Sequence, residues 1–299
     1  MMTTPTEPKH LYHYTSQKGL LGILDIYQKE PKPSLWMTDI LYLNDSSEYT
    51  HTLDLVKTEV KERKKQLPPF KRKGLMTQEL TQEDEIVNKT HDTYEYIENF
   101  CDDLRDDNRI KFYVFSLSEE KDDLNQWRSY CPQEGGFCIE FDYNGLESLM
   151  KITKKYRMEK CKYTPDEKQK SVEYILDPIP RIFRSDIEES VKNTCIFVFS
   201  LIINSSSYIK HDSFNKEREH RIIHEGNDVD EIKYREGKSM IIPYTEFSLV
   251  DKNVPLSITK IIVGPTPHPE LSKLSIEGLL KSKGYKIEVE SSEVPYRSW

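Results

Sequence analysis

The sequence predicts an α+β protein whose strands gather at both ends of the chain and whose helices occupy the middle. Short runs rich in aromatic and β-branched residues recur near the N-terminus and again from residue 109 onward. The stretch 167–210 is typical of helices broken at Pro178 and Pro180. Aromatic residues make up 11% of the chain, which indicates real cores because disordered chains are poor in aromatics.

Strands are expected where apolar and aromatic residues lie between turn residues. The clearest unit is strand–helix–strand, in which a helix holding Trp127 and Tyr130 and a turn at Gly135-Gly136 separate two strands. The expected strands are 11–15, 35–38, 112–117, 137–142, 156–163, 220–224, 240–242, 258–263 and 285–289.

Helices are expected where apolar residues recur every three or four positions or where a capping residue opens a polar run. Apolar residues at 20, 21, 23, 24 and 27 predict a helix over 17–27. Asn44 or Asp45 is expected to cap a helix reaching about residue 65, and Asn144-Gly145 to open another. We expect a loose tail over 1–9 and a single domain over 10–299, with a charged helical insertion at about 60–108 that ends in a helix near 91–104.

Net charge, cysteine content and the length of apolar runs limit the classes of protein to which the chain can belong. The net charge of −8 provides no general attraction for nucleic acid, although the basic runs at 61–65 and 71–73 leave phosphate binding open beside the reading as solvated surface. Five cysteines without a C-x-x-C are typical of reduced cytosolic thiols. No leader peptide and no apolar run of membrane length is found, so we expect a soluble cytoplasmic protein without a membrane partner.

Three polar segments are candidates for chemistry. If extended, Glu217, Glu219 and Arg221 share one face of a strand, which suits a catalytic carboxylate or a surface charge ladder. His13 stands in a short strand, where it binds a ribose hydroxyl or is satisfied by backbone. Trp127 and Tyr130 lie three apart in a helix, where they pack in a core or stack on a flat ring.

Metal and mononucleotide motifs have little support. The acidic cluster Asp102, Asp103, Asp106 and Asp107 suggests a metal site, but a solvated helix face explains it better. His220 and His224 would pair as metal ligands only in a helix, and their surroundings favour a strand. The chain has no G-x-G-x-x-G, Walker A, H-E-x-x-H or G-x-S-x-G sequence.

Taken in order, the segments resemble a bacterial family catalogued as domain of unknown function 2971, over about residues 10–290. That family has no settled activity. The matching residues are Tyr12-His13-Tyr14, Asn44, Asp45, Glu48, Ser116, Trp127, Tyr130, Gly136, Glu140-Phe141-Asp142, Glu217, Glu219, Arg221 and Ile261-Ile262-Val263-Gly264-Pro265.

More weakly, His13-Tyr14-Thr15-Ser16 and Glu217-x-Glu219 are similar to motifs of ADP-ribosyltransferases. This resemblance implies a split antiparallel sheet and NAD as substrate, with no metal. Glu219 would stabilise the charge left as nicotinamide departs, His13 would hold the nicotinamide ribose, and Trp127 or Tyr130 would stack on nicotinamide. The other residues expected around NAD are Tyr14, Thr15, Ser116, Arg128, Glu217 and Arg221.

The function implied is an NAD-consuming ADP-ribosyltransferase or NAD glycohydrolase, of the kind that acts as a toxin or phage-defence effector. The acceptor of any ADP-ribose is not indicated. A non-catalytic nucleotide-sensing or interaction module is one alternative. A metal-dependent nuclease using carboxylates of 102–107, or Glu140 and Asp142, is another.

Overall fold

The computed structural model describes residues 8–43, 48–71, 80–105, 111–132, 135–184, 190–226, 232–237 and 239–296. The chain forms two compact units, each assembled from separate stretches of sequence. The first unit holds Met1–Tyr42, Phe112–Cys161 and Lys216–Trp299, and the second holds Leu43–Lys111 and Lys162–Asn215. The segment expected as an insertion, about 60–108, thus belongs to the same unit as residues 162–215. The expectation of a single domain over 10–299 stays a prediction.

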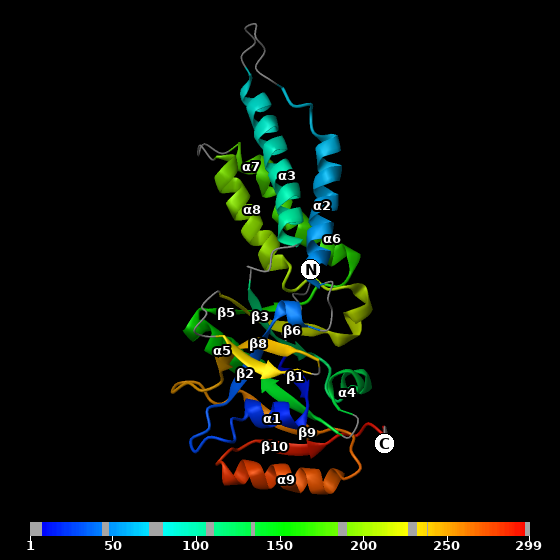
Figure 1. Ribbon diagram of the computed structural model, residues 1–299, viewed down its shortest axis with the longest axis vertical. Helices are drawn as coiled ribbons and strands as arrows, with labels where there is room; N and C mark the ends of the chain where they lie inside the picture. Colours follow the sequence, from blue (N-terminus) through cyan, green and yellow to red (C-terminus); the bar gives the residue numbers. More distant parts are fainter. Residues whose placement is uncertain are drawn as a thin grey trace, which may run out of the picture. The chain divides into compact units, whose positions relative to one another are not determined.

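Among the described residues of the first unit, ten strands form one sheet (Figure 1). Their order is β10-β9-β4-β1-β3-β2-β8-β7, with β6 paired to β3 and β5 paired to β6. Every pairing is antiparallel except that of β9 with β10, which confirms the predicted α+β class. The strands are β1 His10–Thr15, β2 Ser34–Asp39, β3 Phe112–Ser118, β4 Phe137–Asp142, β5 Tyr156–Lys160, β6 Glu219–Glu225, β7 Lys233–Glu236, β8 Ile241–Ser248, β9 Ile258–Val263 and β10 Glu288–Ser291.

Two strands share one edge of β3. Strand β6 pairs with β3 along its whole length, from Phe112 to Ser118, and so occupies the other edge. On the shared edge, Tyr12 of β1 pairs with Ser118, whereas Thr38 of β2 pairs with Val114. No described strand pairs with this edge between those two points. We call this opening, where β1 and β2 diverge along β3, the fork.

The two faces of the sheet differ in chemistry because successive side chains of a strand point to opposite sides. Leu11 of β1 belongs to the main apolar core together with Phe115 and Leu117 of β3 and Ile222 of β6, and we call this side the core face. Tyr12 and Ser118 lie on the opposite side, here called the polar face. Among its described residues the unit also has the 3₁₀ turn η1 Ile40–Tyr42 and four α-helices: α1 Gln17–Ile23, α4 Leu124–Tyr130, α5 Tyr143–Thr153 and α9 Pro269–Ser282, which runs beside β10 (Figure 1).

Helix α1 packs on both β1 and β2, the strands that diverge at the fork. It begins where the Ser16 hydroxyl accepts a hydrogen bond of 3.1 Å from the backbone N–H of Gly19. It ends at Ile23, earlier than the predicted residue 27, and Asp25 then takes a left-handed φ of 51°. A Cβ at Gly22 would lie 2.4 Å from the Trp36 ring, so only glycine permits this close approach of α1 to β2.

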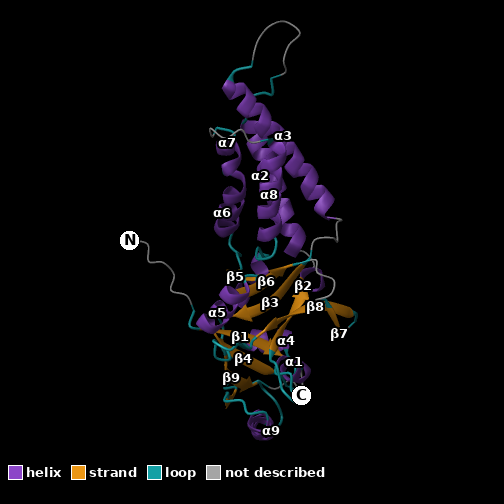
Figure 2. Cartoon of the chain, turned by 90° about the vertical axis from the view of Figure 1, so that its left-hand side faces the viewer, coloured by secondary structure: helices purple, strands orange, loops and turns teal. Residues whose placement is uncertain are grey.

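The second unit is helical (Figure 2). Helix α3 covers much of the segment expected as a surface insertion, yet Ile86, Tyr94, Ile97 and Cys101 recur on one side of it and are buried. Charged residues fill the other positions, which explains why the segment looks solvated in sequence. The elements are α2 Glu48–Gln66, α3 Gln82–Arg105, α6 Pro165–Leu176, α7 Pro178–Ile182, α8 Val191–Ser205 and the 3₁₀ turn η2 Asp212–Glu217, which runs into the first unit.

Most predicted strands are confirmed within a few residues, but β7 and α9 were not predicted. Strand β7 has only four residues, and three of them are charged, so its composition is unlike that of a typical strand. The expected cap Asn44 or Asp45, the tail up to residue 7, and Asp106 and Asp107 lie outside the described residues. Among the described helices, none is long and apolar enough to cross a membrane.

Helix α6 carries a capping box that can be tested. The Thr164 hydroxyl accepts from the N–H of Glu167 at 3.3 Å, and the Glu167 carboxylate accepts from the N–H of Thr164 at 3.0 Å. We expect Thr164→Ala to lower the free energy of unfolding by about 1 kcal/mol, measured by denaturant titration with circular dichroism. Thr164→Ser keeps the hydroxyl and should lose far less; equal losses in the two variants would contradict a capping role.

Candidate functional site

His13 lies at the fork and replaces part of the missing backbone ladder. Its Nδ1 donates a hydrogen bond of 2.9 Å to the backbone carbonyl of Ser116, on the unpaired stretch of the β3 edge. The imidazole also lies 4.2 Å, centroid to centroid, from the Phe115 ring. A side chain therefore satisfies a carbonyl that a regular antiparallel strand would have satisfied with a backbone N–H.

The protonation state of His13 follows from this position. Burial lowers its pKa to about 4, the Ser116 carbonyl partly opposes that shift, and the positive charge of Arg235 adds to it. The ring is therefore neutral at pH 7. Because a carbonyl can only accept, Nδ1 carries the proton and Nε2 is an acceptor, for which the described residues provide no donor. The residue stays partly exposed, so Nε2 suits a ligand hydroxyl.

On the polar face, five side chains form a continuous row across five strands. Lys260 of β9 pairs with Glu140 of β4, Glu140 with Tyr12 of β1, Tyr12 with Ser118 of β3, and Ser118 with Glu219 of β6. We call this the polar row. Directly paired positions in a sheet have Cβ atoms about 5 Å apart, so neighbouring members of the row can contact one another.

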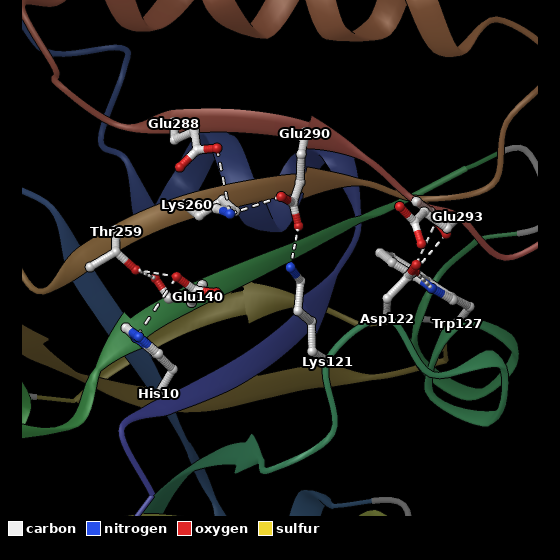
Figure 3. Close-up of polar contacts among 11 residues, drawn as sticks. His10, Lys121, Asp122, Trp127, Glu140, Thr259, Lys260, Glu288, Glu290 and Glu293 are labelled. Carbon is white, nitrogen blue, oxygen red and sulfur yellow. Dashed lines mark hydrogen bonds and ion pairs between the residues drawn. The ribbon is translucent and has the colours of Figure 1, made fainter.

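At the β9 end, hydrogen bonds and ion pairs tie the polar row to its surroundings (Figure 3). The Lys260 ammonium lies 2.8 Å from the Glu290 carboxylate, which also contacts Lys121 at 2.6 Å. The Glu140 carboxylate accepts from the Thr259 hydroxyl at 2.8 Å. These partners satisfy the charges at this end of the row and make it a structural network.

At the β6 end, Glu219 forms a buried ion pair with Arg221. The Nε of Arg221 donates to Oε1 of Glu219 at 2.7 Å, and a second nitrogen approaches Oε2 at 3.3 Å. Both residues are buried, with exposed fractions of 4% and 1%. Arg221 pairs across the sheet with Ser116, the residue whose carbonyl binds His13. The structure thus brings His13, Ser116, Glu219 and Arg221 to three adjoining strands, but the His13 side chain lies on the core face beside Phe115 whereas those of Glu219 and Arg221 lie on the polar face.

The prediction that Glu217, Glu219 and Arg221 share one strand face required an extended segment, and Glu217 lies outside strand β6. It ends the 3₁₀ turn η2, and Arg218 has a left-handed φ of 42° before β6 begins. The change of backbone direction breaks the alternation, so the extended geometry applies only to Glu219 and Arg221. The Glu217 carboxylate instead accepts a hydrogen bond of 2.7 Å from the Tyr130 hydroxyl.

Trp127 lies in a separate aromatic cluster with Tyr14. The two rings meet edge to face at 4.7 Å, and the indole N–H donates to Asp122 at 2.8 Å. Only 3% of Trp127 is exposed, and a Cβ at Gly264 would lie 2.6 Å from its ring. Tyr14 is occupied as well, since its hydroxyl donates to the Glu120 carbonyl at 2.7 Å. The predicted stacking of Trp127 on nicotinamide would require this closely packed ring to become exposed.

The other predicted residues also lie apart from His13. The Arg128 guanidinium lies over the Tyr296 ring at 4.8 Å. The exposed side chain of Tyr130 is bound to Glu217, as described above. Thr15 faces α1, where its hydroxyl would lie 2.0 Å from a Cβ at Gly19. Helical spacing alone placed Trp127 and Tyr130 together, but one is buried and the other is not.

Sequence reasoning missed the residues on the other side of the fork. The Nη2 of Arg235 donates to the Thr38 hydroxyl at 2.9 Å. On the same face of β2 and β8, the Trp36 and Tyr244 rings lie 5.2 Å apart. The predicted strand 35–38 identified the first of these strands, but β7, which carries Arg235, gave no usable signal.

Metal ligation finds no support in the described part of the chain, where no three His, Cys, Asp or Glu residues lie close enough to hold an ion. Asp102 instead forms an ion pair with Lys57. His220 is in a strand, and its Nε2 lies 2.8 Å from the Glu119 carboxylate.

Comparison with known proteins finds one family model that is similar to the centre of the chain. Residues 126–222 match the family described as protein of unknown function (DUF2971), which confirms the resemblance over this segment. The matched segment contains Trp127, Glu219 and Arg221. No curated protein and no solved structure matches the chain.

The lowered pKa of His13 makes stability depend on pH. Between its ordinary value of about 6.5 and the folded value near 4, the unfolded chain binds more protons, so acid favours unfolding. We expect His13 to account for a loss of up to about 3 kcal/mol in the free energy of unfolding between pH 7 and pH 4, with no further change below. Urea titrations of wild type and His13→Gln across this range measure it.

Glutamine retains an N–H donor for the Ser116 carbonyl but does not titrate, so the variant should lose this part of the pH dependence. His268→Gln, at an exposed site, should behave as wild type. An unchanged pH profile in His13→Gln would show that His13 is not the titrating group.

Proposed function

We propose that the protein binds a nucleotide at the fork and consumes NAD, transferring or hydrolysing its ADP-ribose. The observation that carries the proposal is the placement of a neutral imidazole with an accessible acceptor nitrogen beside the strand pair that holds a buried, ion-paired carboxylate. His13 Nε2 would accept a hydrogen bond from a ribose hydroxyl. His13 and Glu219 lie on opposite faces of the sheet, so Glu219 would reach the reacting carbon only through the fork.

The chemistry needs these two parts. When the bond between C1 of the ribose and the nicotinamide nitrogen breaks, nicotinamide leaves with the bonding electrons and positive charge develops on the sugar. A fixed carboxylate stabilises that charge without reorganising. Water or an acceptor nucleophile then bonds to C1 and releases a proton. The Arg221 guanidinium lies 2.7 Å from the Glu219 carboxylate and provides it with a buried counter-charge.

The topology supports the same proposal. The resemblance to ADP-ribosyltransferases implies a split antiparallel sheet with the histidine at a strand end and the glutamate on another strand. Here β1, which carries His13, and β6, which carries Glu219, pair with opposite edges of β3. Such an enzyme would act in the cytoplasm, as a toxin or phage-defence effector.

A non-catalytic nucleotide-binding module is the second candidate, and the contact between Glu219 and Arg221 favours it. Both carboxylate oxygens of Glu219 lie near guanidinium nitrogens of Arg221. A carboxylate held in this way can fix the start of β6 without meeting a substrate. In this case a nucleotide binds at the fork and leaves unchanged.

Release of nicotinamide from NAD separates the two candidates. We expect wild type to release nicotinamide and Glu219→Gln to be at least about a hundredfold slower, since it loses the charge that stabilises the sugar cation. Glu225→Gln removes an exposed carboxylate from the same strand and should keep full activity. Binding of NAD by wild type without turnover would support the module instead.

The thermal unfolding temperature of Glu219→Gln distinguishes a catalytic role of Glu219 from a structural one. A large drop in Glu219→Gln, accompanied by loss of NAD binding, would show that the Glu219–Arg221 pair holds the fold. Equal turnover by wild type and Glu219→Gln would remove Glu219 from the mechanism.

A further inference from the structure

We propose that Arg235 and Thr38 form a binding site for a phosphate group at the fork. Arg235 lies on β7, and its Nη2 donates to the Thr38 hydroxyl on β2 at 2.9 Å. Its Nε is buried and has no acceptor among the residues that the structure describes. A guanidinium has five N–H donors, so most of its capacity remains for a ligand.

The charge of Arg235 has no counter-ion among the described residues. The two neighbouring charges of β7 are both paired: Lys233 with Glu246 at 2.8 Å, and Glu236 with Lys18 at 2.5 Å. Thr38, which is itself buried, provides Arg235 with a neutral partner only. A partly desolvated cation without a carboxylate costs free energy, and a bound anion recovers it.

Burial lowers the pKa of Arg235, with a partial opposing effect from Tyr244. An arginine in a protein nevertheless stays protonated near neutral pH, so the positive charge persists at the site. Its charge also disfavours protonation of His13, which places the two groups within electrostatic range of each other.

Phosphate is the anion that fits these neighbours. A planar guanidinium binds two oxygens of a phosphate at once, and the Thr38 hydroxyl holds the group in position. His13, on the opposite face of the sheet at the same fork, would provide an acceptor for a sugar hydroxyl. The Trp36–Tyr244 pair adds an aromatic surface on the face of β2 that carries Thr38. A sugar, a phosphate and a flat ring are the parts of a nucleotide, so this site rests on the nucleotide binding proposed above, but not on NAD cleavage.

Calorimetric titration of the full chain with inorganic pyrophosphate and with ADP tests the site. We expect wild type to bind both ligands and Arg235→Gln to bind each about tenfold or more weakly, since a charged hydrogen-bonding partner is lost. Lys233→Gln removes a positive charge two residues away on the same strand and should bind as wild type. Thr38→Val should weaken binding by a smaller factor.

Wild type that fails to bind pyrophosphate and ADP would overturn the site, as would Arg235→Gln with unchanged affinity. Without ligand, Arg235→Gln should unfold at the same temperature as wild type or higher, because it removes an unpaired charge. A marked decrease would show that the fold itself needs the guanidinium and would also overturn the proposal. Nicotinamide release is measured separately. If Arg235→Gln turns over NAD with an unchanged KM, the phosphate site is refuted but NAD cleavage is not.

Discussion

The hydrogen bond from His13 to the carbonyl of Ser116 is the contact on which the candidate site depends. An unpaired carbonyl at a sheet interior carries a free-energy cost, and β1 leaves this stretch of β3 without a backbone donor. The imidazole provides the donor in its place. If β1 continued along β3, the edge would be filled with backbone, and neither an acceptor nitrogen nor an opening would remain. The divergence of β1 from β3 therefore both opens the sheet and orients the His13 side chain.

The strands around the fork carry three different kinds of polar group: a neutral acceptor, a positive charge and a negative charge. Burial keeps His13 neutral, which leaves Nε2 as an acceptor, while Arg235 provides donors and a positive charge on the side of β2. On the other side, Glu219 is ion-paired with Arg221 and carries the negative charge. These three environments arise from β1 and from the consecutive strands β6 and β7, which lie far from β1 in the sequence.

Local patterns predicted the strands well and their neighbours poorly. The alternation of Glu219 and Arg221 was right because a strand runs through both residues, and it failed at Glu217 because Arg218 takes a left-handed conformation. Trp127 and Tyr130 were placed together by helical spacing. Trp127 is buried because Gly264 leaves space for its ring and Tyr14 covers its edge, and neither fact is local to the helix.

The sequence by itself determined the α+β class, most of the strands and the part played by residues that act within one segment. It also indicated His13 and Glu219 as chemically interesting, since their types and strand context are local properties. Only the tertiary structure decided that β1 and β2 diverge on one edge of β3 and that Arg235 reaches Thr38, because pairing between strands is a long-range choice. The same holds for α3, whose sparse apolar residues make a core only when other helices cover them. The periodicity of apolar residues depends on a few neighbouring positions, whereas side-chain burial and strand pairing depend on which distant segments pack against them.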